Sequence, residues 1–257
     1  GRPVPAPAPP RPAGAGPEPP GRAAEPPGAA PERRARHEPL SRITGRRAFW
    51  TLDLEIGPET LDPRPETETV VEVVLSALRR QGRDQAPLEV LDVGTGSGAI
   101  LLALLSELPR ARGTGVDVSC GALRIARRNA GRTGLSGRAV MQRGHWLDGL
   151  TGPFDVIVSN PPYIPSAGIR GLEPAVRDYD PRAALDGGAD GLEPYRAIVP
   201  AAARLLAPGG LLAVEIGETQ GPAVDALMAA AGLAPLAETG RVWPDFAGRH
   251  RCVAGKT

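Results

Sequence analysis

The sequence predicts a doubly wound α/β fold with a mostly parallel, seven-stranded sheet, preceded by a disordered tail. The first observation is that short, almost continuously apolar runs alternate with helical stretches from Leu88 onward. Strands that are apolar on both faces are typical of a parallel sheet covered by helices on both sides. The second is that thirteen prolines and five glycines fall among the first 39 residues of the 257-residue chain.

Individual elements follow from periodicity and from helix-capping residues. We expect five strands, at Leu88–Val93, Thr114–Val118, Arg138–Gln142, Phe154–Val158 and Leu211–Ile216. We expect helices over Gly98–Leu108, Tyr195–Leu206 and Gln220–Ala231, a helix over Glu66–Arg80 with acidic first and basic last turns, and one over Ser119–Arg132 with Ser119 as its N-cap. The remaining segment, Leu233–Ala254, is expected to close the sheet with a hairpin.

Residues 1–36 alternate Pro, Ala, Gly and Arg, with no apolar side chain larger than that of Val4. Such a stretch cannot bury enough surface to offset its backbone entropy, so we predict a disordered tail, with a polyproline-type ligand as the alternative. The globular domain is predicted over residues 86–257.

Composition excludes several classes of protein. A net charge of +1 gives no electrostatic reason to expect nucleic acid or a membrane surface as a partner. Cys120 and Cys252 do not form a CxxC pair, so neither a zinc site nor a disulfide framework is expected, and no metal is predicted. The longest apolar run, Ala99–Leu105, is far shorter than a membrane span. A soluble intracellular protein is expected.

The first predicted strand runs into a glycine-rich turn, Asp92-Val-Gly-Thr-Gly-Ser-Gly98, ahead of a helix. Glycines there let backbone N–H groups approach a ligand at the helix N-terminus. Asp117, at the end of the second strand, has the spacing at which a carboxylate can accept both hydroxyls of a ribose. Together they predict a nucleoside-containing cofactor. A dinucleotide, a turn without ligand and a capping role for Asp117 remain alternatives.

The fourth strand ends in Asn160-Pro161-Pro162-Tyr163, which should face the same crevice as the glycine turn. Consecutive prolines fix two φ angles and donate no hydrogen bonds, so nearby carbonyls are left as acceptors. The Asn160 oxygen adds an acceptor and Tyr163 adds a flat face. Acceptors beside an aromatic ring suit a planar –NH2 group, which favours methyl transfer to nitrogen over dinucleotide chemistry. A proline-rich turn that closes a strand is the alternative.

These motifs resemble those of class I S-adenosylmethionine-dependent methyltransferases, which have a Rossmann-like fold. Three further segments are similar to the peptide chain release factor N5-glutamine methyltransferase family, namely those at residues 38–45, 61–68 and 172–188. The resemblance covers the chain from about residue 38 to its end.

The resemblance implies that S-adenosyl-L-methionine methylates N5 of the glutamine in the Gly-Gly-Gln loop of bacterial release factors, in the cytoplasm. It implies that the cofactor lies against Gly94, Thr95, Gly96, Ser97, Gly98, Asp117, Trp146 and Asn160. It implies that Asn160, Pro161, Pro162 and Tyr163 bind the glutamine amide, with Asn160, Pro161 and Tyr163 catalytic. An ordinary core aromatic is the alternative for Trp146.

Two departures from the family pattern stand out. Family members carry a helical docking domain at their N-terminus, whereas residues 37–85 are expected to form a linker and a remnant of that region. The residue before Trp146 is His145, where the family commonly has Asp, and we expect a surface or packing role for it.

Other functions stay open: glutamine methylation of a ribosomal protein, N6-methylation of adenine in nucleic acid, and a cofactor-binding interaction module without catalysis. A monomer, a release factor as protein partner and no sequence-specific nucleic-acid binding are expected.

Overall fold

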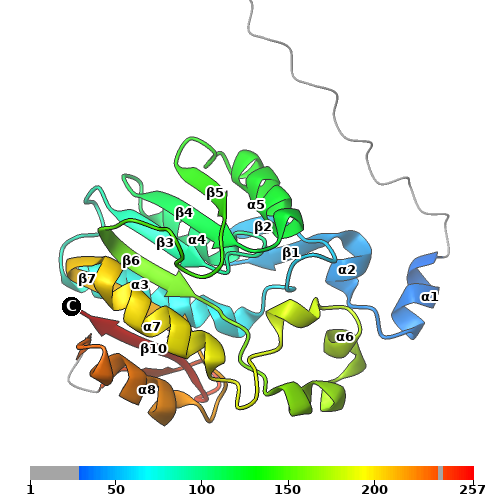
Figure 1. The fold of residues 1–257 in the computed structure, drawn as a ribbon. Helices are drawn as coiled ribbons and strands as arrows, with labels where there is room; N and C mark the ends of the chain where they lie inside the picture. Colours follow the sequence, from blue (N-terminus) through cyan, green and yellow to red (C-terminus); the bar gives the residue numbers. More distant parts are fainter. Residues whose placement is uncertain (1–28, 237–239) are drawn as a thin grey trace, which may run out of the picture.

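A central sheet of eight strands organises the computed structural model, which describes residues 29–236 and 240–257 (Figure 1). Seven strands follow the order β5-β4-β3-β6-β7-β10-β8, and β9 pairs with β10. Neighbouring strands from β5 to β7 are parallel, whereas β10 is antiparallel to β7. The strands of the sheet are β3 (Glu89–Val93), β4 (Arg112–Asp117), β5 (Ala139–Arg143), β6 (Phe154–Ser159), β7 (Leu206–Glu215), β8 (Ala234–Pro235), β9 (Val242–Pro244) and β10 (His250–Lys256). The predicted doubly wound α/β fold is confirmed.

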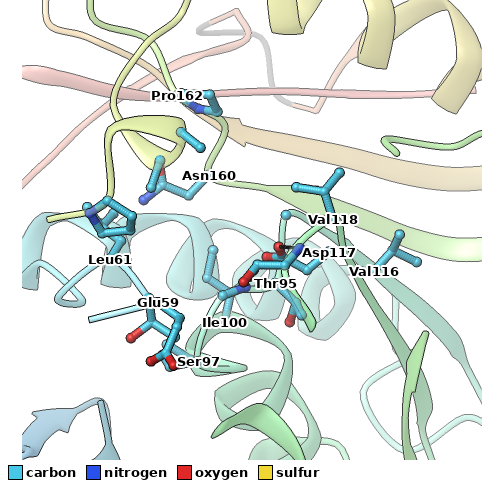
Figure 2. Close-up of a pocket in the computed structure, with 18 of the residues that line it drawn as sticks. Glu59, Leu61, Thr95, Ser97, Ile100, Val116, Asp117, Val118, Asn160 and Pro162 are labelled. Atoms are coloured by element: carbon cyan, nitrogen blue, oxygen red, sulfur yellow. Dashed lines mark hydrogen bonds between the residues drawn. The ribbon is translucent and has the colours of Figure 1, made fainter. Parts of the chain in front are cut away.

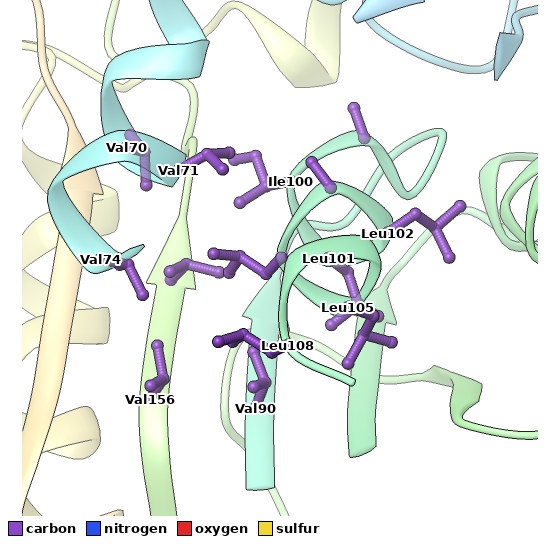
Figure 3. Close-up of a cluster of buried hydrophobic side chains, with 14 of the residues drawn as sticks. Val70, Val71, Val74, Val90, Ile100, Leu101, Leu102, Leu105, Leu108 and Val156 are labelled. Atoms are coloured by element: carbon purple, nitrogen blue, oxygen red, sulfur yellow. The ribbon is translucent and has the colours of Figure 1, made fainter. Parts of the chain in front are cut away.

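Helices cover both faces of the sheet. One face carries α3 (Glu68–Arg80), α4 (Ala99–Glu107) and α5 (Cys120–Arg132), and the other carries α7 (Glu193–Leu205) and α8 (Gly221–Ala230) (Figure 1). Neighbouring strand residues alternate between two cores. Val90 packs with α3 and α4 (Figure 3), whereas Leu91 belongs to the core on the α7 face. Both side chains are fully buried, which is why the strand reads as a continuous apolar run.

Strand order creates a crevice at one edge of the sheet. The chain goes outward from β3 to β4 and β5, then returns to place β6 on the other side of β3. In open parallel sheets, ligands bind at the carboxyl ends of the strands where the order reverses. The predicted glycine turn and the Asn160–Tyr163 segment leave β3 and β6 at this point.

Local predictions hold for most helices. Ser119 caps α5, because its hydroxyl accepts a hydrogen bond from the Ala122 N–H at 3.1 Å. Helix α3 begins at Glu68, after a 3-10 turn η1 (Pro65–Thr67), and ends on Arg79 and Arg80 as expected from its charges.

The C-terminal part of the sheet differs in detail from the prediction. Seven strands were expected, and the eighth arises because the closing segment supplies two short strands, β8 and β9, beside β10. Strand β7 begins at Leu206, so Pro208-Gly-Gly210 lies inside it rather than before it. The ladder to β6 shifts register there, since Phe154 pairs with Leu206 but Val156 pairs with Leu211, so the extra residues bulge out of the ladder.

Residues 37–85 are ordered structure rather than a linker. They form α2 (Leu40–Thr44), the β1–β2 hairpin (Arg46–Phe49 and Leu52–Glu55), η1 and α3. Apolar residues of α3 share one core with Val90 of β3, so the predicted domain boundary at residue 86 does not separate two cores. The reason is the amphipathic pattern of α3, whose apolar stripe lies on the sheet.

The predicted tail, residues 1–36, is only partly described. Residues 1–28 lie outside the described residues, while Ala29–Ala35 form a short helix, α1, which was not expected. No helix among residues 29–236 and 240–257 is long and apolar enough to cross a membrane.

Candidate active site

A cavity of about 480 Å³ opens at the carboxyl edge of the sheet, within the range of small-molecule sites. The ends of β3, β4 and β6 form its floor, and the segments Glu59–Thr67 and Pro181–Asp186 contribute walls. In Figure 2, Asn160 and Pro162 lie on one side of the cavity, and Thr95 and Asp117 lie on the other. The cavity thus joins the two motifs that the sequence singled out.

The glycine turn presents bare backbone to this cavity. Gly94 and Gly96 have φ angles of 75° and 57°, which residues other than glycine rarely adopt. A Cβ added at Gly94 would meet nothing within 4 Å, so the space it would enter is open. Thr95 and Ser97 also line the cavity, whereas Gly98 is the N-cap of α4 and lies outside the lining.

Asp92 is buried and holds the glycine turn through hydrogen bonds. Its Oδ2 accepts hydrogen bonds from the Thr95 hydroxyl at 2.7 Å and from the Leu101 N–H at 3.3 Å. Burial raises the pKa of Asp92 to about 7, against the lowering effect of these two bonds, and the Asp117 charge raises it further. The carboxylate therefore fixes the turn without facing the cavity itself.

Asp117 bridges the glycine turn and the start of α5. Its Oδ2 accepts from the Gly96 N–H at 2.9 Å, and its Oδ1 accepts from the Ser119 N–H at 2.8 Å. Each carboxylate oxygen has more than one lone pair, so both can still accept a hydroxyl from a ligand in the cavity.

Trp146 lines the cavity from a strained backbone position. Its φ angle is 48°, an uncommon conformation for a bulky side chain that costs of order 1–3 kcal/mol. Such strain persists where surrounding structure over-determines it, and Trp146 is indeed half-buried, packed against the core on the α7 face while it lines the cavity. His145 also lines the cavity, with its ring centroid 5.3 Å from that of Trp146 and its side chain 64% exposed.

Asn160 is oriented by a residue that the sequence had not identified as part of the site. Its Nδ2 donates to the hydroxyl of buried Thr67 at 3.2 Å. Since the amide nitrogen is engaged by Thr67, the Oδ1 of this cavity-lining residue is the atom available to accept from a ligand.

The rest of the Asn160–Tyr163 segment divides in two. Pro162 lines the cavity, whereas Pro161 is buried and Tyr163 is not among the lining residues. The Tyr163 hydroxyl points instead toward Glu215, to which it donates at 3.3 Å. The structure therefore does not bring the Tyr163 ring to the cavity, as the predicted flat face required.

A buried ionic cluster holds the walls together. Arg42, from α2, donates to Asp180 and to the carbonyls of Gly57 and Thr60, the latter at 2.6 Å. Arg64 donates to the other oxygen of Asp180 at 2.5 Å. The side chains of Arg42 and Asp180 are 5% and 1% exposed, so this interior ion pair joins α2 to the residue that precedes the wall segment Pro181–Asp186.

The sequence did not identify Thr67 or Asp180 as part of the site, nor the apolar residues that line much of the cavity. Thr67 lies in the segment 61–68 on which the family resemblance rests, but no local sequence pattern indicates that it binds Asn160. Further lining residues that were not predicted are Glu59, Thr60, Leu61, Pro63, Ala99, Ile100, Val116, Val118, Ser119, Gly144, Pro181, Ala183, Ala184 and Asp186.

Comparisons with known proteins agree with this architecture. The family model of the methyltransferase small domain matches residues 68–170. The release factor glutamine methyltransferase of Rhodospirillum rubrum is 50% identical over 224 residues, which cover 87% of this chain and 66% of that protein. That of Caulobacter vibrioides is 48% identical over 225 residues, which cover 87% of this chain and 75% of that protein. The crystal structure of a methyltransferase from Pyrococcus furiosus matches with a TM-score of 0.56 at 19% identity, covering 88% of this chain and 98% of that one.

The fold, the glycine turn and the cavity at the strand ends define a methyltransferase. At close to half identity over most of its length, the chain belongs to the release factor glutamine methyltransferase family. It spans 66% and 75% of the lengths of the two relatives.

Proposed function

We propose that this chain transfers a methyl group from S-adenosyl-L-methionine to N5 of the glutamine in the Gly-Gly-Gln segment of bacterial release factors. The relatives' shared name supports the protein substrate. The single observation that carries the chemistry is Asn160, which Thr67 holds with one acceptor oxygen left for a ligand at the cavity. A primary amide, with two N–H donors on one nitrogen, fits that acceptor.

The donor side of the cavity suits S-adenosylmethionine. The open space over Gly94 admits a ligand close to the backbone, and the N-terminus of α4 favours a carboxylate there. Thr95, Gly96 and Ser97 continue this surface, Asp117 would accept the ribose hydroxyls, and Trp146 would border the adenine. When bound, the cofactor supplies a sulfonium methyl group that is a strong electrophile.

The acceptor side has to hold a poor nucleophile, since the lone pair of an amide nitrogen is delocalised. Asn160 Oδ1 and backbone carbonyls of the proline-rich segment would accept the two N–H hydrogens and turn the nitrogen toward the donor side. Accepted hydrogen bonds also stabilise positive charge that grows on the nitrogen. Pro161 and Pro162 keep these acceptors fixed because their φ angles are locked.

Positioning is then the main contribution of the protein. Holding two reactants in line can supply about 7–11 kcal/mol of the barrier. No nucleophilic side chain is required by this scheme, since the amide nitrogen would attack the methyl carbon directly. The bond between that carbon and sulfur would break, its electron pair would stay on sulfur as the thioether S-adenosylhomocysteine, and the methylated nitrogen would lose one proton to water.

We further propose that the enzyme works as a monomer in the bacterial cytoplasm, with a release factor as its partner. The net charge of +1 gives no support to N6-methylation of adenine in a nucleic acid, which would use the same acceptor chemistry. Methylation of a ribosomal protein glutamine uses that chemistry too, so the substrate has to be tested directly.

The deciding experiment incubates the purified protein with radiolabelled S-adenosylmethionine and one acceptor at a time. The acceptors are a bacterial release factor, the same factor with the Gln of its Gly-Gly-Gln segment replaced, ribosomes, and DNA. We expect label on the intact factor alone. Equal labelling of the replaced factor, or label on ribosomes or DNA in its place, would contradict the proposal.

A further inference from the structure

Tyr163 is held at two points by the chain beyond β7, although it ends the segment that begins with Asn160. Its hydroxyl donates to Oε1 of Glu215 at 3.3 Å. Its carbonyl accepts from Nε2 of Gln220 at 3.0 Å, and the same Nε2 donates to the Gly191 carbonyl at 3.1 Å. The residue is therefore fastened through side chain and backbone, facing away from the cavity.

Glu215 is an unusual residue for its position. It ends β7, where the preceding residues Leu211–Val214 are apolar and buried, and it is itself only 1% exposed. Burial raises the pKa of Glu215 to about 7, and the Thr67 hydroxyl, the Arg251 charge and the Tyr163 hydroxyl oppose that rise. A buried carboxyl is costly to a fold, so its place between these groups needs a reason.

The neighbours of Glu215 supply that reason. The Thr67 hydroxyl lowers the pKa of the neighbouring Glu215 carboxyl group and accepts a hydrogen bond from Asn160 Nδ2 at 3.2 Å. Tyr163 binds the same carboxylate. Tyr163, at one end of the Asn160–Tyr163 segment, thus binds the buried carboxyl group directly, and Asn160, at the other end, binds a threonine beside that group.

We propose that Glu215 is a positioning residue that sets the orientation of Asn160 through Thr67 and Tyr163. The two prolines between Asn160 and Tyr163 make the segment stiff, so a shift at one end is passed to the other. The inference rests on the proposed function, because Asn160 is the acceptor in that reaction.

The test uses Glu215→Met, which removes both carboxylate oxygens and keeps an unbranched side chain, and Tyr163→Phe, separately and together, in the full chain. Tyr163→Phe keeps the ring and removes only the hydroxyl, so it separates anchoring from a role of the aromatic face. We expect kcat for methylation of the release factor to fall about 10²-fold in each single variant, as for a small misplacement of a reacting group. We expect the Kd for S-adenosylmethionine, measured by calorimetry, to stay unchanged. The double variant should lose no more than the more affected single one, since both remove the same bond.

Tyr195→Phe is the matched control. Tyr195 is a buried tyrosine on α7 whose hydroxyl donates at 2.8 Å to the backbone carbonyl of Glu215 and, at 3.5 Å, to Oε1 of Gln220, but not to the Glu215 carboxylate. This variant loses a buried hydrogen bond beside the same residue, so it should unfold at lower temperature and keep its kcat. If Tyr163→Phe keeps the wild-type kcat, or if Tyr195→Phe lowers kcat equally, the proposal is overturned.

A second readout does not depend on the methyl acceptor. The side-chain amide resonances of Asn160, followed by NMR in the protein with no substrate added, report its hydrogen bond to Thr67. They should shift in Glu215→Met and Tyr163→Phe and not in Tyr195→Phe. Should the wild-type enzyme fail to methylate the release factor, the proposed function falls, while these resonances still decide whether Glu215 positions Asn160.

Discussion

Replacing Asp180 by Asn tests whether the ionic cluster holds the cavity walls together. Asn has the same shape and keeps one acceptor oxygen for Arg42, but it removes the negative charge and the oxygen that accepts from Arg64. Arg42 would then be a guanidinium with 5% exposure and a neutral partner. Breaking such a buried pair typically costs 3–5 kcal/mol.

The lower end of that range applies here, because Asp62 remains in the cluster, 3.8 Å from Arg64 and hydrogen-bonded to Ser41 at 2.6 Å. We therefore expect a loss of about 3 kcal/mol in the free energy of unfolding. For a chain of this size, such a loss lowers Tm by roughly 6–12 °C.

Thermal unfolding followed by circular dichroism measures this shift, and Asp190→Asn is the control. Asp190 also pairs with an arginine, Arg196, at 2.5 Å, but the two side chains are 47% and 50% exposed. Exposed pairs contribute little, so Tm should hardly change in this variant. An Asp180→Asn protein that unfolds no earlier than Asp190→Asn would refute the role given to the cluster.

Three other variants test the site itself. Asn160→Ala should retain S-adenosylmethionine binding and lose ~2.7–4 kcal/mol of transition-state stabilisation, as for one preorganised hydrogen-bonding group, and a wild-type kcat in single-turnover assays would contradict the assignment. Gly94→Ala puts a Cβ into the open space of the cavity at a φ of 75°, so calorimetry should find weaker cofactor binding, and unchanged affinity would argue against the glycine turn as donor site. Asp92 has a pKa of about 7 in the fold against 3.8 ordinarily, so the folded protein favours the protonated carboxyl group. Its contribution to the free energy of unfolding is therefore complete below about pH 4 and is lost as the pH rises to about 7. In Asp92→Asn, the free energy of unfolding should therefore decrease less steeply with pH over that range, by up to ~1.4 kcal/mol per pH unit. Urea titrations at pH 5, 6 and 7 measure this slope, and a slope equal to that of the wild type would contradict the explanation.

The parallel sheet was predictable because its signal is local. A strand buried on both faces, such as Phe154–Ser159, shows as an apolar run wherever it occurs, and helices such as α5 carry their own cap. The eighth strand was not predictable, because β8 has two residues and β9 has three, too few for any periodic pattern. Both strands pair with β10, so they depend on contacts between distant parts of the chain rather than on a local sequence pattern.

The candidate site divides in the same way. The glycine turn and the Asn160–Tyr163 segment are contiguous in sequence, and each has a backbone requirement that only certain residues meet. Thr67 and Glu215 act on Asn160 from far along the chain, and neither a threonine in a loop nor a carboxyl at a strand end identifies its partner. For Tyr163 the residue type suggested a flat face, and the structure assigns its hydroxyl to Glu215 instead.

Arg42 has a consequence for how far the chain can be shortened. Among the described residues, none before Glu59 lines the cavity, so a chain cut after α2 would keep every lining side chain. It would nevertheless lose the guanidinium that fastens Asp180 to the carbonyls of Gly57 and Thr60. Arg64 and the Asp62 N–H would still bind Asp180, but Gly57 and Thr60 would lose their hydrogen bonds to the arginine that also binds Asp180. We therefore expect a fragment that begins ahead of α2 to hold the site more firmly than one that begins after it.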